Sequence, residues 1–283
     1  MNDTSFFTQT HVYFKKVFRI SLREKAWKYL IFAVIIASIV ALIVGPDMFK
    51  SFESTNSGFF TLASACIWIG IFNSIQSICK EHEIIRAEYR QGMKMSAYVT
   101  AHVLWQALLC FAQAIVIFVI CCVFMHFDQS PHLLISAYAE NFVTIYLLTF
   151  GAAVLGLMIS SISGTPTTAM TIMPFVLIVQ LVLSGVLFVL KDAAEWFSFI
   201  TLSKWGMSAF GCEADLNAIP TTIQSSISQI PQAQGLVITN TLTSDFYKPE
   251  VLTLLTAWGA CLVITLFNVV VSVVALKVKN RDS

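Results

Sequence analysis

The chain has 283 residues, of which 57% are hydrophobic and only 12% charged, and its mean hydropathy is +0.77. Soluble domains carry roughly twice that share of charge, so the composition excludes an ordinary soluble protein and indicates residence in a lipid bilayer. The net charge of +1 gives no reason to expect nucleic acid as a partner.

Residues 1–28 form an N-terminal arm. In its stretch "QTHVYFKKVFRISLREKAWK", apolar residues recur between bases at helical spacing. This pattern predicts a cytoplasmic amphipathic connecting helix that lies in the inner headgroup layer. A basic flank that only sets membrane topology is the alternative.

Residues 29–283 contain six apolar runs, each long enough to cross about 30 Å of hydrocarbon. Gly164 and Pro166 separate the fourth run from the fifth by a tight turn. We therefore expect an all-α integral membrane fold with six transmembrane helices. The expected spans are 29–46, 58–79, 98–125, 138–162, 167–190 and 251–276.

Lys and Arg are sorted between the two sides of these spans. With the N-terminus inside, thirteen of the seventeen bases lie on the inner side. The outer side then holds only Lys50, Lys191, Lys204 and Lys248. The asymmetry predicts a multi-pass protein of the cell membrane with both termini in the cytoplasm.

The segment 80–97 is a compact charged stretch between the second and third spans, on the cytoplasmic side. It mixes acids with bases, whereas lipid binding favours bases alone. Mixed charge suits docking on another protein. A solvated connector is the alternative.

The segment 191–250 is a long loop on the extracytoplasmic side. Its aromatic-rich start, "AAEWFSFITLSKWGMSAFG", predicts short helices resting on the outer membrane face, with Lys204 reachable from outside. Of the seven Cys, only Cys212 lies in this loop, and the other six lie within or beside apolar runs. Buried thiols are expected, and an intersubunit bridge through Cys212 stays open.

Motifs for chemistry are absent from the sequence. No GxxxxGK, HExxH or CxxC occurs, so we expect neither a catalytic site nor a metal site on this chain. His102 is interpreted as a packed or interfacial side chain. Neutral polar groups inside the spans predict hydrogen bonds between helices, with cavity lining as the alternative; they are Asn73, Gln76, Gln106, Gln113, Gln180 and Asn268.

Three stretches resemble ABC exporter permeases of the ABCG (White) type. "EHEIIRAEYRQGMKMSAYVTAHVL" resembles the signature that follows the second helix, although Lys94 stands where the family often has Tyr. "FFTQTHVYFKKVFRISLREK" resembles the family's connecting helix, and "LSGVLFVLKDAAEWFSFITLSKWGMSAF" resembles its fifth helix and outer loop. The three occur in the family's order and cover nearly the whole chain.

The resemblance implies that segment 80–97 is a coupling helix, which docks on a nucleotide-binding domain. The residues carried over for coupling are Glu81, Arg86, Glu88, Arg90 and Gly92. Because the chain shows no fused ATPase, a separate ABC ATPase subunit is implied, with ATP and Mg on that partner and no cofactor here. Six helices form half of a pathway, so a second permease chain, identical or different, is also implied.

The resemblance further implies a slit at the dimer axis, between the second and fifth helices of each chain. Its expected cavity residues are Trp68, Ile69, Phe72, Ile178, Leu181 and Val182, and its expected gate is Val186 with Leu187. Packing against lipid or other helices is the alternative for all eight.

The predicted function is export of lipophilic or amphipathic cargo (a drug, a lipid or a hydrophobic peptide) by the membrane subunit of an ATP-driven exporter. An apolar, aromatic cavity favours such cargo. The alternatives are an export permease for a lipid-linked glycan or another polymer, and a membrane scaffold that transports nothing and recruits a cytoplasmic partner.

Overall fold

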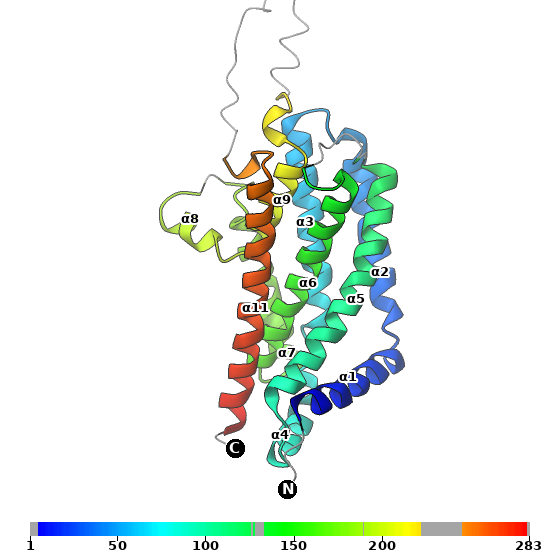
Figure 1. Ribbon diagram of the computed structural model, residues 1–283, viewed down its shortest axis with the longest axis vertical. Coiled ribbons are helices and arrows are strands. Elements are labelled where there is room, and N and C mark those ends of the chain that lie inside the picture. Colours follow the sequence, from blue (N-terminus) through cyan, green and yellow to red (C-terminus); the bar gives the residue numbers. More distant parts are fainter. Residues whose placement is uncertain (1–4, 126, 128–132, 189, 222–244, 282–283) are drawn as a thin grey trace, which may run out of the picture.

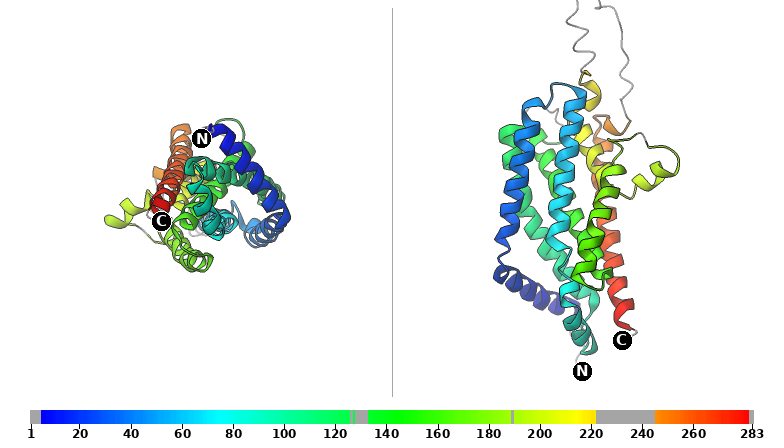
Figure 2. Two further views of the ribbon diagram at one scale, coloured as in Figure 1. Left: turned by 90° about the horizontal axis from the view of Figure 1, so that it is seen from below. Right: turned by 180° about the vertical axis from the view of Figure 1, so that it is seen from behind.

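The computed structural model describes residues 5–125, 127, 133–188, 190–221 and 245–281, and these residues form a bundle of helices (Figure 1). No strand occurs in this described part. The longest elements stand side by side along one axis, as the lower and rear views also show (Figure 2). In chain order the elements are α1 Phe6–Arg23, α2 Trp27–Val44, η1 Gly45–Asp47, α3 Phe52–Ser74, η2 Cys79–Glu81, α4 His82–Arg90, α5 Met95–Phe124, α6 Ala137–Ile162, α7 Pro166–Val182, α8 Ala193–Ser198, α9 Leu202–Glu213, η4 Leu216–Ala218, η6 Asp245–Tyr247 and α11 Val251–Arg281.

Five helical stretches of the described chain are long and apolar enough to cross a membrane, which identifies a multi-pass membrane protein. They contain α2, α3, α5, α6 and α11, at the places of five of the six expected spans. The helix at the place of the fifth expected span, α7, has only 17 residues. It is about 26 Å long at 1.5 Å per residue, just short of the hydrocarbon thickness.

The amphipathic arm is confirmed as a helix. The helix α1 ends near Lys25, whose φ of 63° turns the chain sharply into α2. As a result α1 lies across the lower end of the bundle while α2 runs along it (Figure 1). The C-terminal end of α11 and the short helix α4 lie at this same end.

The centre of the bundle is the contact between α3 and α6. Small residues allow this close approach: a Cβ at Gly70 would collide with the carbonyl oxygen of Thr149, and one at Gly156 with the Ser74 hydroxyl. The Ser74 hydroxyl in turn donates a hydrogen bond of 2.5 Å to the carbonyl of Ala153. Close packing through small residues is a main source of helix association in membranes.

Neutral polar side chains join α2, α3 and α5, as predicted. Asn73 and Gln113 exchange two amide hydrogen bonds, of 2.6 and 3.1 Å, and the Gln113 amide also donates to the carbonyl of Tyr29 at 3.1 Å. On the other side of the bundle, Gln180 of α7 accepts the backbone N–H of Ser203 at 3.1 Å.

The prediction that the first outer-loop helices rest on the membrane face is wrong for α9. This helix packs against α3, α6 and α11, and all its side chains except that of Trp205 are buried. Small residues again permit the insertion, because a Cβ at Gly206 would collide with Leu148. The neighbouring α8, by contrast, projects from the bundle (Figure 1) and exposes Trp196 and Phe197.

Insertion of α9 also changes two expectations about single residues. Lys204 is 9% exposed, and its amine lies over the rings of Phe199 and Phe246, 4.6 and 4.3 Å from their centroids. It is therefore not the accessible amine that the sequence predicted. Cys212 is free and fully buried, and its thiol donates to the carbonyl of Lys248 at 3.0 Å. In this structure it is not placed to bridge to another chain.

Candidate functional site

The charged segment 80–97 is not one helix. A short 3-10 turn leads into α4, which ends at Arg90, and α5 begins at Met95. Gly92 lies between them with a φ of 98°, a conformation that glycine adopts without steric strain. The nine-residue α4 therefore sits at the tip of a sharp turn below the bundle (Figure 1).

One face of α4 packs onto the bundle. Ile85 is fully buried in a cluster with Met93, Tyr98 and Leu276, which come from the chain after α4, from α5 and from α11. This apolar contact fixes the orientation of α4 relative to two long helices.

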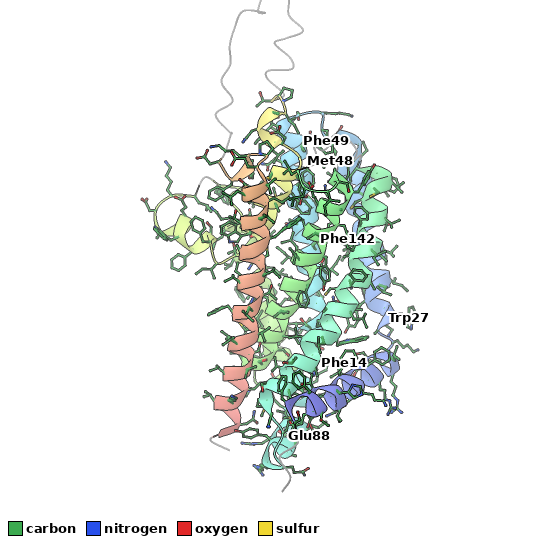
Figure 3. The ribbon with its side chains drawn as sticks, viewed as in Figure 1. Phe14, Trp27, Met48, Phe49, Glu88 and Phe142 are labelled. Carbon is green, nitrogen blue, oxygen red and sulfur yellow. The ribbon has the colours of Figure 1, made fainter. Side chains whose placement is uncertain are left out.

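Two of the predicted coupling residues point toward α1 rather than outward. Lys16 of α1 lies 3.0 Å from Glu88 and 3.8 Å from Glu81, and Tyr98 donates to Glu81 at 3.0 Å. Figure 3 shows Glu88 beside α1 at the lower end of the molecule. Burial, together with the negative charge of Glu88, raises the pKa of Tyr13 to about 12. Glu81 and Glu88 thus fasten α4 to the amphipathic helix.

The opposite side of α4 is held by the ends of α6 and α11. Ser160 of α6 accepts the backbone N–H groups of Ile78 and Cys79, at 3.1 and 3.0 Å. Lys279 of α11 donates to the carbonyl of Ser163 at 2.8 Å, and the His82 ring nitrogen Nε2 lies 2.7 Å from its amine. Four elements far apart in the sequence therefore meet around α4.

The remaining face of α4 is exposed. It carries Glu83, Ile84, Arg86, Ala87 and Arg90, and the Ile84 side chain is 48% exposed. An exposed aliphatic residue surrounded by charges of both signs is the composition expected of a small protein-docking surface. We call these five residues the docking face.

The predicted cavity residues divide into exposed and buried positions. Trp68 and Phe72 on α3 are both exposed, with ring centroids 6.1 Å apart. On α7, Ile178 and Val182 are exposed and Leu181 is partly buried. Ile69 is only 4% exposed and belongs to the main core, so it does not share the exposed surface of Trp68 and Phe72.

The predicted gate residues lie outside the helix in which they were expected. The helix α7 ends at Val182, where the Ser184 hydroxyl donates to the Leu181 carbonyl at 2.7 Å and Gly185 takes a φ of 81°. Val186 and Leu187 follow in a turn. Val186 packs against the main core, and Leu187 is 51% exposed.

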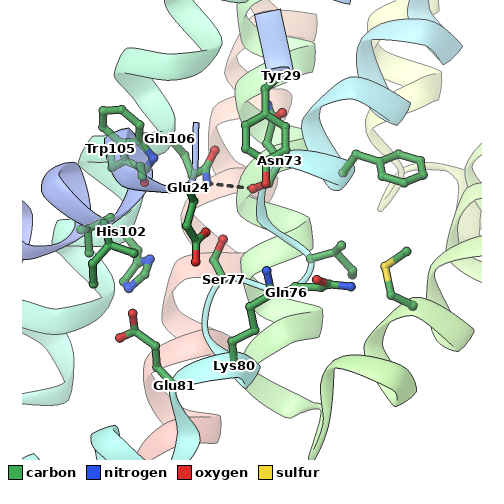
Figure 4. A pocket seen from close by; sticks show the side chains of 16 residues that line it. Glu24, Tyr29, Asn73, Gln76, Ser77, Lys80, Glu81, His102, Trp105 and Gln106 are labelled. Atoms are coloured by element: carbon green, nitrogen blue, oxygen red, sulfur yellow. Dashed lines mark hydrogen bonds between the residues drawn. The ribbon is translucent and has the colours of Figure 1, made fainter. Parts of the chain in front are cut away.

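The sequence did not predict a polar chamber near the lower end of the bundle. It has a volume of about 390 Å³ and lies where α1 and α2 meet the ends of α3 and α5 (Figure 4). His102 is among its lining residues and is also packed, as the sequence predicted: it is 3% exposed and its ring lies 4.6 Å from that of Tyr98. The sequence nevertheless held a sign of this chamber: the polar residues Asn73, His102 and Gln106 lie at neighbouring depths in two of the expected spans. In the described part of the chain, no three His, Cys, Asp or Glu side chains are grouped to hold a metal ion.

Comparison with known proteins identifies the family. No curated protein matches the chain. The sequence model of the ABC-2 type transporter matches residues 8–210, more than two thirds of the chain, from α1 through most of α9. Members of this family are membrane permease components of ABC transporters and work with an ATPase subunit. The chain therefore belongs to the ABC-2 type transporter family, as a permease component rather than the ATPase.

Proposed function

We propose that the chain is one permease subunit of an ATP-driven exporter of the ABCG-like kind, which moves lipophilic or amphipathic cargo outward. ATP and Mg bind to a separately encoded ATPase, and a second permease chain completes the pathway. The end of the bundle that carries α1 and α4 faces the cytoplasm. The sorting of Lys and Arg supports this orientation.

The observation that carries the proposal is the docking face of α4. It lies at the predicted cytoplasmic end. The helix α4 contacts α1 and α11, and the turn before it, η2, contacts α6. A force applied to α4 is therefore transmitted to several long helices at once. Arg86 and Arg90 contribute to the docking face, Gly92 makes the turn behind it, and Glu81 and Glu88 anchor it.

The exposed apolar sides of α3 and α7 support the cargo class. We retain Trp68, Phe72, Ile178, Leu181 and Val182 as the wall of the slit, and Ile69 supports that wall from behind. Such a wall offers dispersion contacts and few hydrogen bonds, which suits lipophilic molecules better than a hydrated polymer. Val186 and Leu187 form the gate as part of a turn.

The test is docking and coupling with the Ile84→Asp variant. The permease is co-expressed with a candidate ABC ATPase subunit from the same genome, and the complex is purified and reconstituted in liposomes. Because a charge replaces the exposed aliphatic centre of the docking face, we expect at least about tenfold weaker ATPase capture and loss of cargo-stimulated ATP hydrolysis. Ile135→Asp makes the same change at an exposed isoleucine before α6, at the other end of the bundle, and should leave both unchanged.

Unaltered capture and stimulation in Ile84→Asp would show that α4 is not the docking element. If the wild-type complex hydrolyses ATP but moves none of a panel of lipophilic compounds, lipids and peptides, the cargo class is wrong while the docking role stands.

A further inference from the structure

The polar chamber is bounded by α1, α2, α3, α5 and the turn before α4. Three side chains converge in it from separate segments, namely Glu24 from the α1–α2 junction, Glu81 from the turn before α4 and His102 from α5 (Figure 4). Its volume of about 390 Å³ falls within the range of small-molecule sites, roughly 300–1,000 Å³.

Two buried polar groups in the chamber have no hydrogen-bond partner. His102 is 3% exposed and neither ring nitrogen is bonded, and the Gln106 amide oxygen is likewise buried and unbonded. The other end of the Gln106 amide donates to the carbonyl of Asn73 at 3.4 Å. Buried polar groups are nearly always hydrogen-bonded in native proteins. The Gln106 oxygen and one imidazole nitrogen need donors, and the other imidazole nitrogen needs an acceptor, so the pair points to a polar ligand that supplies N–H or O–H donors among its groups.

The free positions in the chamber are mostly acceptors. The Gln106 oxygen accepts, a neutral imidazole has one acceptor nitrogen, and the Glu24 carboxylate accepts through two oxygens. Glu81 has one oxygen left, because its Oε2 already accepts from Tyr98 and lies near Lys16. Lys16 also lies near Glu81, at 3.8 Å, but its closer partner is Glu88 at 3.0 Å. Lys80 is the lysine among the lining residues and brings a positive charge to the edge of the chamber.

Aromatic and aliphatic side chains complete the lining. Trp105 and Tyr29 contribute rings, and a cation over such a ring is attracted by its negative face. Phe72 of α3 and Met170 of α7 border the chamber on the side of the proposed slit. A ligand can therefore place a polar head among the acceptors and an apolar tail against these two residues.

We propose that this chamber binds the ammonium head of an amphipathic molecule, which enters from the inner leaflet. Glu24 and Glu81 supply the opposite charge, His102 and Gln106 accept its N–H groups, and the tail leaves toward Phe72. A membrane phospholipid with an amine headgroup and a cationic amphiphile share this chemistry. The inference rests on the proposed function only for the assignment of the inner leaflet.

The test is photolabelling of the full chain in maltoside micelles. The probe is a dodecylamine with a photoreactive diazirine beside its amine, and labelled residues are located by mass spectrometry. We expect saturable labelling of the chamber. His102→Phe removes the imidazole at similar volume and should weaken binding about tenfold. Glu24→Gln removes a charge at an exposed position and should weaken binding about two- to fivefold. Glu195→Gln makes the same change as Glu24→Gln on exposed α8 and should have no effect.

Competition distinguishes the two sources of the ammonium group. If dioleoyl phosphatidylethanolamine displaces the probe and dioleoyl phosphatidylglycerol does not, the ligand is a lipid headgroup. If neither displaces it, the site takes a cationic amphiphile.

Equal labelling by the matching neutral alcohol probe, or unchanged binding in Glu24→Gln, would overturn the proposal. Glu24 is exposed, so its variant keeps the test decisive even if His102→Phe fails to fold. Binding is read without transport, so a negative result here leaves the proposed function standing, and a failure of transport leaves this site standing.

Discussion

Ser160→Ala is expected to loosen the connection between α4 and the rest of the bundle. The Ser160 hydroxyl oxygen is fully buried and accepts two backbone N–H groups, those of Ile78 and Cys79, where the chain turns from α3 toward α4. Alanine has no hydroxyl group, so both N–H groups lose their acceptor.

The size of the effect follows from the two donors. A buried donor that loses its partner costs about 1–3 kcal/mol, so the loss of both should destabilise the fold by about 2–6 kcal/mol. Ser161→Ala is the matched control. Its hydroxyl is equally buried on the same helix but donates only to the Leu157 carbonyl within α6, so its removal should cost less than about 1 kcal/mol.

Two measurements check this expectation. Thermal unfolding in maltoside micelles should show a drop of several degrees for Ser160→Ala and little change for Ser161→Ala. In liposomes, the number of cargo molecules moved per ATP should fall for Ser160→Ala, because α4 would move without pulling α6. Equal unfolding temperatures and equal coupling in the two variants would refute the reasoning.

Three further predictions follow from other contacts. In a double-mutant cycle between Lys16 and Glu88, the partly buried ion pair should give a coupling of about 0.5–1 kcal/mol in unfolding titrations, and zero coupling would mean that it does not anchor α4. An impermeant amine reagent should leave Lys204 unlabelled until the protein unfolds, and fast labelling in the folded state would contradict the insertion of α9. Val186→Ala combined with Leu187→Ala should raise basal ATPase activity, whereas wild-type activity with no leak would place the gate elsewhere.

Much of the helical framework was predictable because lipid requires long apolar segments. Five spans and the amphipathic arm appear at the expected places. The extent of α7 was not predictable from hydropathy, because the residues after Val182 are as apolar as those before it. The helix ends there through the Ser184 bond and the positive φ of Gly185, which are local backbone features.

The remaining errors concern which surface a residue faces. The charge pattern marked α4 as a docking segment but could not show that Glu81 and Glu88 find Lys16 and Tyr98 within the same chain. Periodicity likewise could not place Ile69 inward. The insertion of α9 could have been predicted from the spacing of its small residues, which a count of residue types does not reveal. Gly206 and Ala209 are small residues three positions apart, on one face of the helix, which is typical of a helix packed among others.

The two hydrogen bonds between the side-chain amides of Asn73 and Gln113 have a mechanical consequence for the bundle. Two side chains that bond reciprocally inside an apolar layer allow only one axial register of α3 against α5, and the bond to the Tyr29 carbonyl extends this restriction to α2. A sliding movement along these three helices would break all three bonds at once. These bonds therefore favour movement of the three helices together, as one plate. Any rearrangement that opens a path for cargo has to tilt this plate as a unit or move the shorter α7 beside it.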